Sequence, residues 1–229
     1  MSEAATRRTA GTFGILASLF IVVQVPLYFL YETPPDWDIL TRSLVGITGC
    51  TLYLVFFSGL RQLIRTVDPR SEWLASLVQV AGALWVVMVF VTQSMEAGAA
   101  ISVDRDIDTT TEGPFAAAQY LMQGGISRLL MALLLIALGI AVGRLRFLPT
   151  WVGRSAYVLA AINLAFVPAL YFGDNAADFY SAQGWGTTAS MGALWSLWTL
   201  AVGISTLRSA RRAEAAEQHP NGPKVPSYA

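Results

Sequence analysis

Six long apolar stretches alternate with short charged segments along this chain of 229 residues. Each stretch has about 20 mostly apolar residues, the length that a helix needs to cross the hydrocarbon core of a bilayer. The stretches cover residues 11–30, 43–63, 73–92, 126–145, 151–172 and 188–207. We therefore predict an all-α polytopic membrane protein with six transmembrane helices in one bundle.

The composition argues against a soluble globular domain. Hydrophobic residues make up 55% of the chain and charged residues 13%, whereas a soluble domain has roughly 45–50% and about 25% respectively. A soluble fold of this length could not bury so much apolar surface, but lipid can face it. The formal net charge is zero, so the chain has no basic excess that would attract nucleic acid, and no nucleic-acid partner is expected.

The charged residues alternate in sign from one connection to the next. Twelve of the fifteen Lys and Arg residues lie in the N-terminal segment, the second and fourth connections and the C-terminal tail, or at the adjoining ends of the apolar stretches. Ten of the fifteen Asp and Glu residues lie in the first, third and fifth connections. Because the cytoplasmic loops of membrane proteins are enriched in Lys and Arg, we predict that both termini are cytoplasmic.

This pattern divides the chain into three parts. Residues 1–10 form a cytoplasmic N-terminal segment, residues 11–207 form the six-helix transmembrane domain, and residues 208–229 form a disordered cytoplasmic tail. The tail is assigned as disordered because it lacks apolar periodicity and contains Pro223 and Pro226 near its end.

Two arginines, Arg42 and Arg128, lie on the acidic side of the chain, contrary to the positive-inside pattern, and Glu96 lies within plausible reach of both. At about 1.5 Å per residue, Arg42 and Arg128 both lie roughly 27 Å above the basic ends of their helices, close to the level of Glu96. An ionisable side chain near a hydrocarbon core is a candidate for function. We interpret Arg42, Arg128, Gln93 and Glu96 as candidate binding residues. Three alternatives remain: a structural Arg–Glu–Arg cluster joining the second, third and fourth helices, an anion- or headgroup-binding pocket, or side chains that reach water separately.

Three carboxylates are candidate catalytic residues. Asp174 and Asp178 lie four residues apart in the fifth connection, beside Phe179 and Tyr180. Paired carboxylates next to aromatic side chains are suited to acid and base catalysis on a lipid or isoprenoid, and Glu96 is the third candidate. The alternative for Asp174 and Asp178 is an exposed, charged cap between two helices.

We predict no cofactor and no metal site. The only histidine, His219, and the only lysine, Lys224, lie in the tail, and the single cysteine, Cys50, lies inside an apolar stretch. The side chains that hold haem, structural zinc or a Schiff base are thus missing from the predicted bundle. The acidic run at residues 104–112 lacks the glycine and glutamate of an EF-hand loop, and the chain contains no nucleotide-binding or common hydrolase motif.

Three segments of the chain carry a family resemblance. They read RRTAG at 7–11, LGIAVG at 138–143 followed by FLPTWVG at 147–153, and LWSLWTLAVG at 194–203. In these segments the chain resembles a bacterial family of six-helix membrane proteins described only as a domain of unknown function (number 4386). Some members have an acidic residue just before the last segment, where this chain has Met191, Gly192 and Ala193. The resemblance implies the six-helix fold and a bacterial cytoplasmic (inner) membrane, and it assigns no activity.

Three functions are compatible with these features. The first is a non-enzymatic membrane protein that binds lipids or a protein partner, as an accessory subunit or a homo-oligomer, with a charged cluster near the outer membrane face. The second is a membrane-embedded enzyme that uses the candidate carboxylates on a lipid or isoprenoid. The third is a small oligomeric transporter, although no pair of broken helices marks a transport site.

Overall fold

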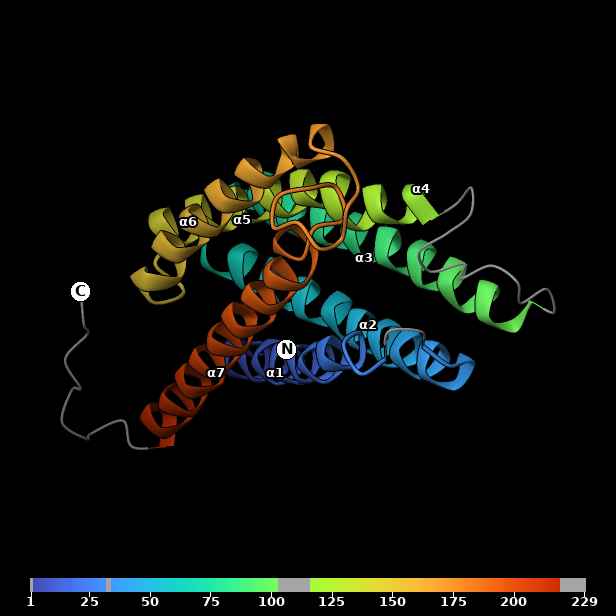
Figure 1. Cartoon of the computed structure of the whole chain (residues 1–229). Coiled ribbons are helices and arrows are strands. Elements are labelled where there is room, and N and C mark those ends of the chain that lie inside the picture. The colour runs from blue at the N-terminus through green and yellow to red at the C-terminus, as the bar shows by residue number, and fades with distance from the viewer. Residues whose placement is uncertain (1, 32–33, 103–115, 219–229) are drawn as a thin grey trace.

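The computed structural model describes residues 2–31, 34–102 and 116–218, which form helices and short connections without any strand (Figure 1). The α-helices are α1 (Glu3–Leu27), α2 (Asp36–Val67), α3 (Glu72–Ile101), α4 (Ala116–Leu121), α5 (Ser127–Leu145), α6 (Thr150–Phe166) and α7 (Met191–Gln218). Shorter helical turns are η1 (Pro69–Ser71), η2 (Met122–Ile126), η3 (Val167–Tyr171) and η4 (Gly186–Ser190). Six helical segments are long and apolar enough to cross a membrane, which confirms the predicted number.

The observed helices are longer than the apolar stretches that predict them. Helix α2 begins at Asp36 rather than near residue 43, and α3 continues to Ile101, well past residue 92. Hydropathy locates the apolar centre of a helix but not its ends, because a helix continues into polar sequence wherever its backbone hydrogen bonds can form. Asp38 and Glu96 consequently lie within helices.

The structure adds a helix to one predicted terminal segment and corrects part of the other. Helix α1 begins at Glu3, so most of the predicted segment 1–10 is helical. Helix α7 continues to Gln218, although a disordered tail is predicted from residue 208. Residues 208–218 are rich in Ala, Arg and Glu, which have high intrinsic helix propensity, and this favours continuation of the helix. The rest of the predicted tail, residues 219–229, lies outside the described residues.

The six long helices pack as a series of neighbours. Helix α1 packs between α2 and α7, α3 packs between α2 and α5, and α6 packs on α5. The order across the bundle is therefore α7, α1, α2, α3, α5 and α6 (Figure 1). Trp198 on α7 donates a hydrogen bond of 2.8 Å from Nε1 to Ser155 Oγ on α6, which connects the two ends of this series.

Contacts between the helix termini define a basic end of the bundle. Arg7 Nη1 on α1 donates to the carbonyl of Phe147, in the α5–α6 turn, at 2.8 Å and to Ser209 Oγ on α7 at 3.2 Å. Arg61 and Arg65 at the end of α2 each lie 2.6 Å from the Glu72 carboxylate at the start of α3. The basic residues predicted to share one side thus meet at one end of the bundle. We call the opposite end, which carries Asp38, Glu96, Asp174 and Asp178, the acidic end.

Aromatic side chains fill the centre of the bundle. Tyr53 on α2 lies at its middle, with ring centroids of Phe57, Trp85 and Trp195 at 5.9, 5.6 and 5.8 Å, and Trp198 lies 5.6 Å from Trp195. Tyr53 and Phe57 have no exposed surface. Edge-to-face and offset aromatic pairs of this kind each contribute about 0.5–1.5 kcal/mol beyond their buried area. We call these five residues the aromatic core; it joins α2, α3 and α7.

Helices α1 and α7 approach each other most closely at two glycines. A Cβ atom on Gly11 would lie 2.7 Å from the backbone nitrogen of Leu207 and 2.9 Å from the carbonyl oxygen of Gly203. Membrane helices pack through small residues because lipid provides no hydrophobic force that would join them at a distance. The two glycines of α5 differ in packing, since Gly139 lies against Tyr157 whereas Gly143 is exposed.

Candidate functional site

Arg42 and Glu96 meet at the acidic end of the bundle. Arg42 Nη2 on α2 lies 2.6 Å from Glu96 Oε1 on α3, and the two side chains are only 5% and 9% exposed. The sequence places Glu96 within plausible reach of Arg42 near the outer ends of their helices. Their ion pair connects two neighbouring helices away from water, where a charge pair is screened far less than on a surface.

Three further polar side chains complete a network around this ion pair. Gln93 Nε2 donates to Glu96 Oε2 and to the hydroxyl of Tyr28, both at 3.1 Å. Tyr28 in turn donates to Glu96 Oε2 at 3.3 Å, and its ring lies 4.4 Å from the Arg42 guanidinium carbon. Gln24 donates to Gln93 Oε1 at 3.1 Å and to the carbonyl of Arg42 at 3.0 Å. Helix α1 is thereby tied to α2 and α3.

Gln24 and Tyr28 belong to the candidate site, although the sequence does not single them out. In the sequence, Tyr28 is one of several aromatic residues near the end of an apolar stretch, and Gln24 is one polar residue within it. Their spacing of four residues places both side chains on one face of α1, and this spacing is the signal that identifies them. Neither residue is charged, so neither is an exception to the charge pattern of the chain.

Asp38 is a second buried carboxylate beside Arg42. Its side chain has no exposed surface, and its Oδ2 lies 3.9 Å from Arg42 Nη1. Neither carboxylate oxygen has a hydrogen-bond partner among the described residues. Since Glu96 already occupies the guanidinium at 2.6 Å, two carboxylates share one arginine. Asp38 is expected from the sequence to be an acidic loop residue, and the longer α2 brings it into the bundle instead.

Arg128 does not join this network. Its Nη1 donates to Asn163 Oδ1 on α6 at 3.4 Å, and its Nη2 donates to the carbonyl of Gln123 at 3.3 Å. The hypothesis of one Arg–Glu–Arg cluster is therefore wrong for Arg128. The position of a residue along a helix axis does not determine the side of the helix from which its side chain projects. The side chain of Arg128 on α5 hydrogen-bonds to α6 rather than to α2.

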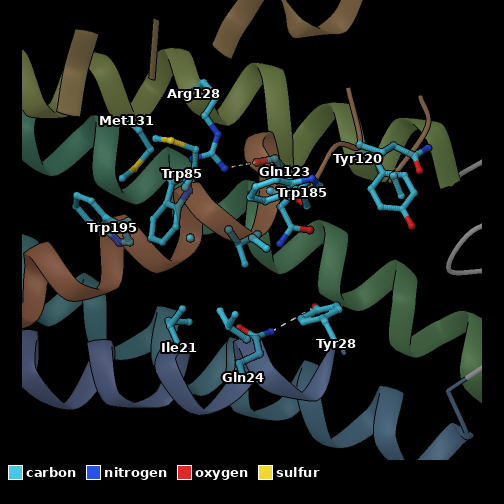
Figure 2. Close-up of a pocket in the computed structure, with 18 of the residues that line it drawn as sticks. Ile21, Gln24, Tyr28, Trp85, Tyr120, Gln123, Arg128, Met131, Trp185 and Trp195 are labelled. Atoms are coloured by element: carbon cyan, nitrogen blue, oxygen red, sulfur yellow. Dashed lines mark hydrogen bonds between the residues drawn. The ribbon is translucent and has the colours of Figure 1, made fainter. Parts of the chain in front are cut away.

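A cavity of about 310 Å³ separates Arg128 from the network. Figure 2 shows Arg128 on one wall, carried by α5, and Gln24 and Tyr28 on the facing wall, carried by α1. The lining residues come from α1 to α5, the η2 and η4 turns, the fifth connection and α7: Ile21, Gln24, Val25, Tyr28, Phe29, Cys50, Trp85, Val89, Tyr120, Gln123, Arg128, Met131, Ala176, Gln183, Trp185, Thr188, Ala189, Met191, Gly192 and Trp195.

The lining changes from apolar to polar along the bundle axis. Toward the basic end it consists of Ile21, Cys50, Trp85, Met131 and Trp195, two of which belong to the aromatic core. The polar lining residues lie toward the acidic end, where apolar Val25, Phe29 and Trp185 also line the cavity; they are Gln24, Tyr28, Tyr120, Gln123, Arg128, Gln183 and Thr188. The cavity therefore has an apolar floor, and its polar groups are concentrated in the upper part.

The fifth connection folds over the polar part of the cavity. Its Trp185 lines the cavity and packs edge-to-face on Phe179, with ring centroids 4.6 Å apart. Backbone bonds hold the connection, including Ala182 N to the carbonyl of Gly173 at 2.9 Å and Thr187 Oγ1 to the carbonyl of Ser181 at 2.8 Å. This connection is a covering element rather than a simple hairpin turn.

The candidate catalytic carboxylates do not line the cavity. Asp174 and Asp178 are exposed and lie in turns, so their spacing of four residues does not place them on one helical face. The structure agrees with the alternative of an exposed, charged cap. Glu96 is buried, but its oxygens are engaged by Arg42, Tyr28 and Gln93. None of the three carboxylates contributes to the cavity lining.

Comparison with known proteins finds no match: no protein-family model, curated protein or solved structure matches the chain. The resemblance to domain of unknown function 4386 therefore stays a prediction. Within residues 2–31, 34–102 and 116–218, no group of three or more His, Cys, Asp or Glu side chains is arranged to hold a metal ion.

Proposed function

We propose that this chain is an integral membrane protein that binds an amphiphilic, lipid-derived molecule in its central cavity. The observation that carries the proposal is the polarity gradient of the lining, from the aromatic floor to the polar upper part near Arg128. An amphiphile has the same gradient, with an apolar chain and a polar head. The cavity volume of about 310 Å³ lies at the lower end of the range of roughly 300–1,000 Å³ that ligand pockets occupy.

The charge distribution suggests the orientation of this site. With the basic end in the cytoplasm of a bacterium, as the positive-inside rule favours, both termini are cytoplasmic and the protein lies in the inner membrane. The polar part of the cavity then lies near the outer membrane face, within reach of lipid headgroups. The bound molecule would place its head toward that face and its chain toward the aromatic core.

Selectivity in such a site must come from the head and from shape. An acyl chain that moves from the bilayer into the cavity leaves one apolar environment for another, so its burial adds little hydrophobic free energy. The polar groups of the upper cavity can distinguish one head from another, because a buried polar group without a partner is costly. The aromatic core limits how far the chain extends.

The other hypotheses have less support. An enzyme would need a carboxylate directed at its substrate, and Glu96, Asp174 and Asp178 do not line the cavity. A transporter would need a polar path along the bundle, whereas the fully buried aromatic residues Tyr53 and Phe57 lie at its centre. A role as an accessory subunit or homo-oligomer is compatible with lipid binding, and co-purification of a protein partner would support it.

Native mass spectrometry of the protein released from mild detergent tests the proposal. We expect the full chain to retain a small molecule of defined mass. Val89→Phe should abolish the adduct, because Val89 lines the cavity and the added ring would occupy it. Val87→Phe is the matched control, since Val87 lies on the same helix but is 52% exposed. Absence of any adduct on the wild-type chain, or equal retention by both variants, would refute cavity binding.

A further inference from the structure

Arg128 presents a buried positive charge to the cavity. The residue is 7% exposed, and it lines the cavity. Within the described residues no carboxylate lies within 4.0 Å of its guanidinium, in contrast to Arg42, which has Glu96 at 2.6 Å. Burial of a charge without an opposite charge is unfavourable. The cavity therefore contains a guanidinium whose charge this part of the chain leaves uncompensated.

The hydrogen-bonding capacity of Arg128 is also largely unused. A guanidinium has five N–H donors. With the described residues it forms two bonds, both long and to neutral oxygens, at 3.4 Å to Asn163 Oδ1 and 3.3 Å to the carbonyl of Gln123. The buried Nε has no partner. The site can therefore donate further bonds to an acceptor that enters the cavity.

Two irregular helical turns lie beside this guanidinium. The π-helical turn η2 carries Gln123 immediately before α5, and the π-helical turn η4 carries Thr188 immediately before α7. Both residues line the cavity. Single π turns inside longer helices are frequent at functional sites. Here the two turns place polar side chains around the upper cavity.

We propose that the cavity selects a single-chain amphiphile with an anionic oxygen head, a carboxylate or a phosphate, and that Arg128 binds this head. This inference rests on the proposed function and adds the chemical class of the ligand. Carboxylates and phosphates accept paired hydrogen bonds from guanidinium and neutralise its charge. An alcohol of the same chain length would leave the charge of Arg128 uncompensated. The cavity volume of about 310 Å³ favours one chain over the two chains of a phospholipid.

The test compares ligands that share one chain and differ in the head. An alkyl carboxylate, an alkyl phosphate and the corresponding alcohol are titrated against the full chain in nanodiscs of zwitterionic lipid, with adduct formation followed by native mass spectrometry. We expect at least one anionic ligand to bind about tenfold or more tightly than the alcohol, as a charge-assisted contact requires. Acetate and inorganic phosphate should not compete, because they lack the chain.

Variants of Arg128 test whether this side chain causes the preference for an anionic ligand over the alcohol. Arg128→Gln should bring the anionic ligand and the alcohol to within about twofold of each other, while Arg128→Lys should retain part of the preference. Arg154→Gln is the matched control, because Arg154 is an exposed arginine on α6 outside the cavity. If Arg128→Gln does not fold, the head-group comparison on the wild-type chain and on Arg128→Lys still decides the question.

The outcomes separate the two proposals. Equal binding of acid, phosphate and alcohol to the wild-type chain would overturn the anionic head and leave amphiphile binding intact. An anionic preference that Arg128→Gln does not change would overturn the role of Arg128. Competition by acetate or inorganic phosphate as strong as by the alkyl ligands would mean an anion site without chain recognition. Failure of all three alkyl ligands to bind would refute the proposed function itself.

Discussion

Arg42 and Glu96 form an ion pair of 2.6 Å between α2 and α3, with both side chains less than one tenth exposed. Tyr28 contacts both partners, because its ring lies 4.4 Å from the guanidinium carbon and its hydroxyl donates to the carboxylate at 3.3 Å. Tyr28 also lines the cavity. The ion pair therefore holds Tyr28 in the cavity wall that faces Arg128. The shape of the cavity consequently depends on the contacts of α1 with α2 and α3.

Removal of one partner from this ion pair should destabilise the bundle strongly. Glu96→Gln leaves the Arg42 guanidinium buried without its closest counter-charge, and loss of one partner of a buried pair typically costs about 3–5 kcal/mol of the free energy of unfolding. Denaturant unfolding in detergent, followed by tryptophan fluorescence, measures the change. Glu3→Gln is the control, because the Arg7–Glu3 pair includes a carboxylate that is 49% exposed. A loss no larger for Glu96→Gln than for Glu3→Gln would contradict the prediction.

Neutralisation of Asp38 should have the opposite consequence. Asp38 is fully buried, its oxygens accept no hydrogen bond among the described residues, and it lies 3.9 Å from an arginine that Glu96 already pairs. Asp38→Asn preserves the shape of the side chain and removes a buried charge with little compensation. We expect the free energy of unfolding to stay within about 1 kcal/mol of the wild-type value or to rise. A loss as large as that of Glu96→Gln would show that Asp38 is an equal partner of Arg42.

The close approach of α1 and α7 should not tolerate a methyl group. Gly11→Ala would place Cβ 2.7 Å from the backbone nitrogen of Leu207, and because backbone atoms cannot rotate away, the helices must separate. Such overpacking costs about 1–3 kcal/mol. Gly143→Ala is the matched control, since no atom lies within 4 Å of the added Cβ and alanine favours helix by about 1 kcal/mol over glycine. We expect the midpoint temperature of thermal unfolding to fall in Gly11→Ala and to rise in Gly143→Ala. Equal shifts in the two variants would contradict this packing.

Substitution of Arg146 by glycine should stabilise the turn between α5 and α6. Arg146 ends α5 with φ 51°, a left-handed conformation that side chains other than glycine adopt at a cost. Arg146→Gly should raise the free energy of unfolding by about 0.5–1 kcal/mol. Arg144→Gly, two residues earlier and inside the helix, should lower it by about 1 kcal/mol. Thermal unfolding of both variants distinguishes the two positions, and a loss of stability in Arg146→Gly would refute the prediction.

Part of the candidate site could be predicted from the charge pattern. Arg42 lies on the acidic side against the positive-inside rule, and the rise of about 1.5 Å per residue in any α-helix places it near the level of Glu96. Arg128 satisfies the same criteria, yet it lies across the cavity from Tyr28 (Figure 2). Gln24 and Asp38 do not stand out in the charge pattern at all. Gln24 has no charge, and Asp38 is one of several acidic residues in the first connection, where the charge pattern expects acidic residues.

The sequence by itself determined the number of crossing helices, the alternation of basic and acidic ends, and the level of each charged residue. These properties are local, because they depend on the composition of one segment and the constant rise of one helix. Only the tertiary structure decided which helices are neighbours, which direction each side chain faces, and that a cavity lies between α1 and α5. Those properties depend on contacts between residues far apart in the chain, such as Gly11 with Gly203 or Tyr28 with Glu96. The apolar stretches are too uniform to specify such contacts, because lipid and helix interior are equally apolar.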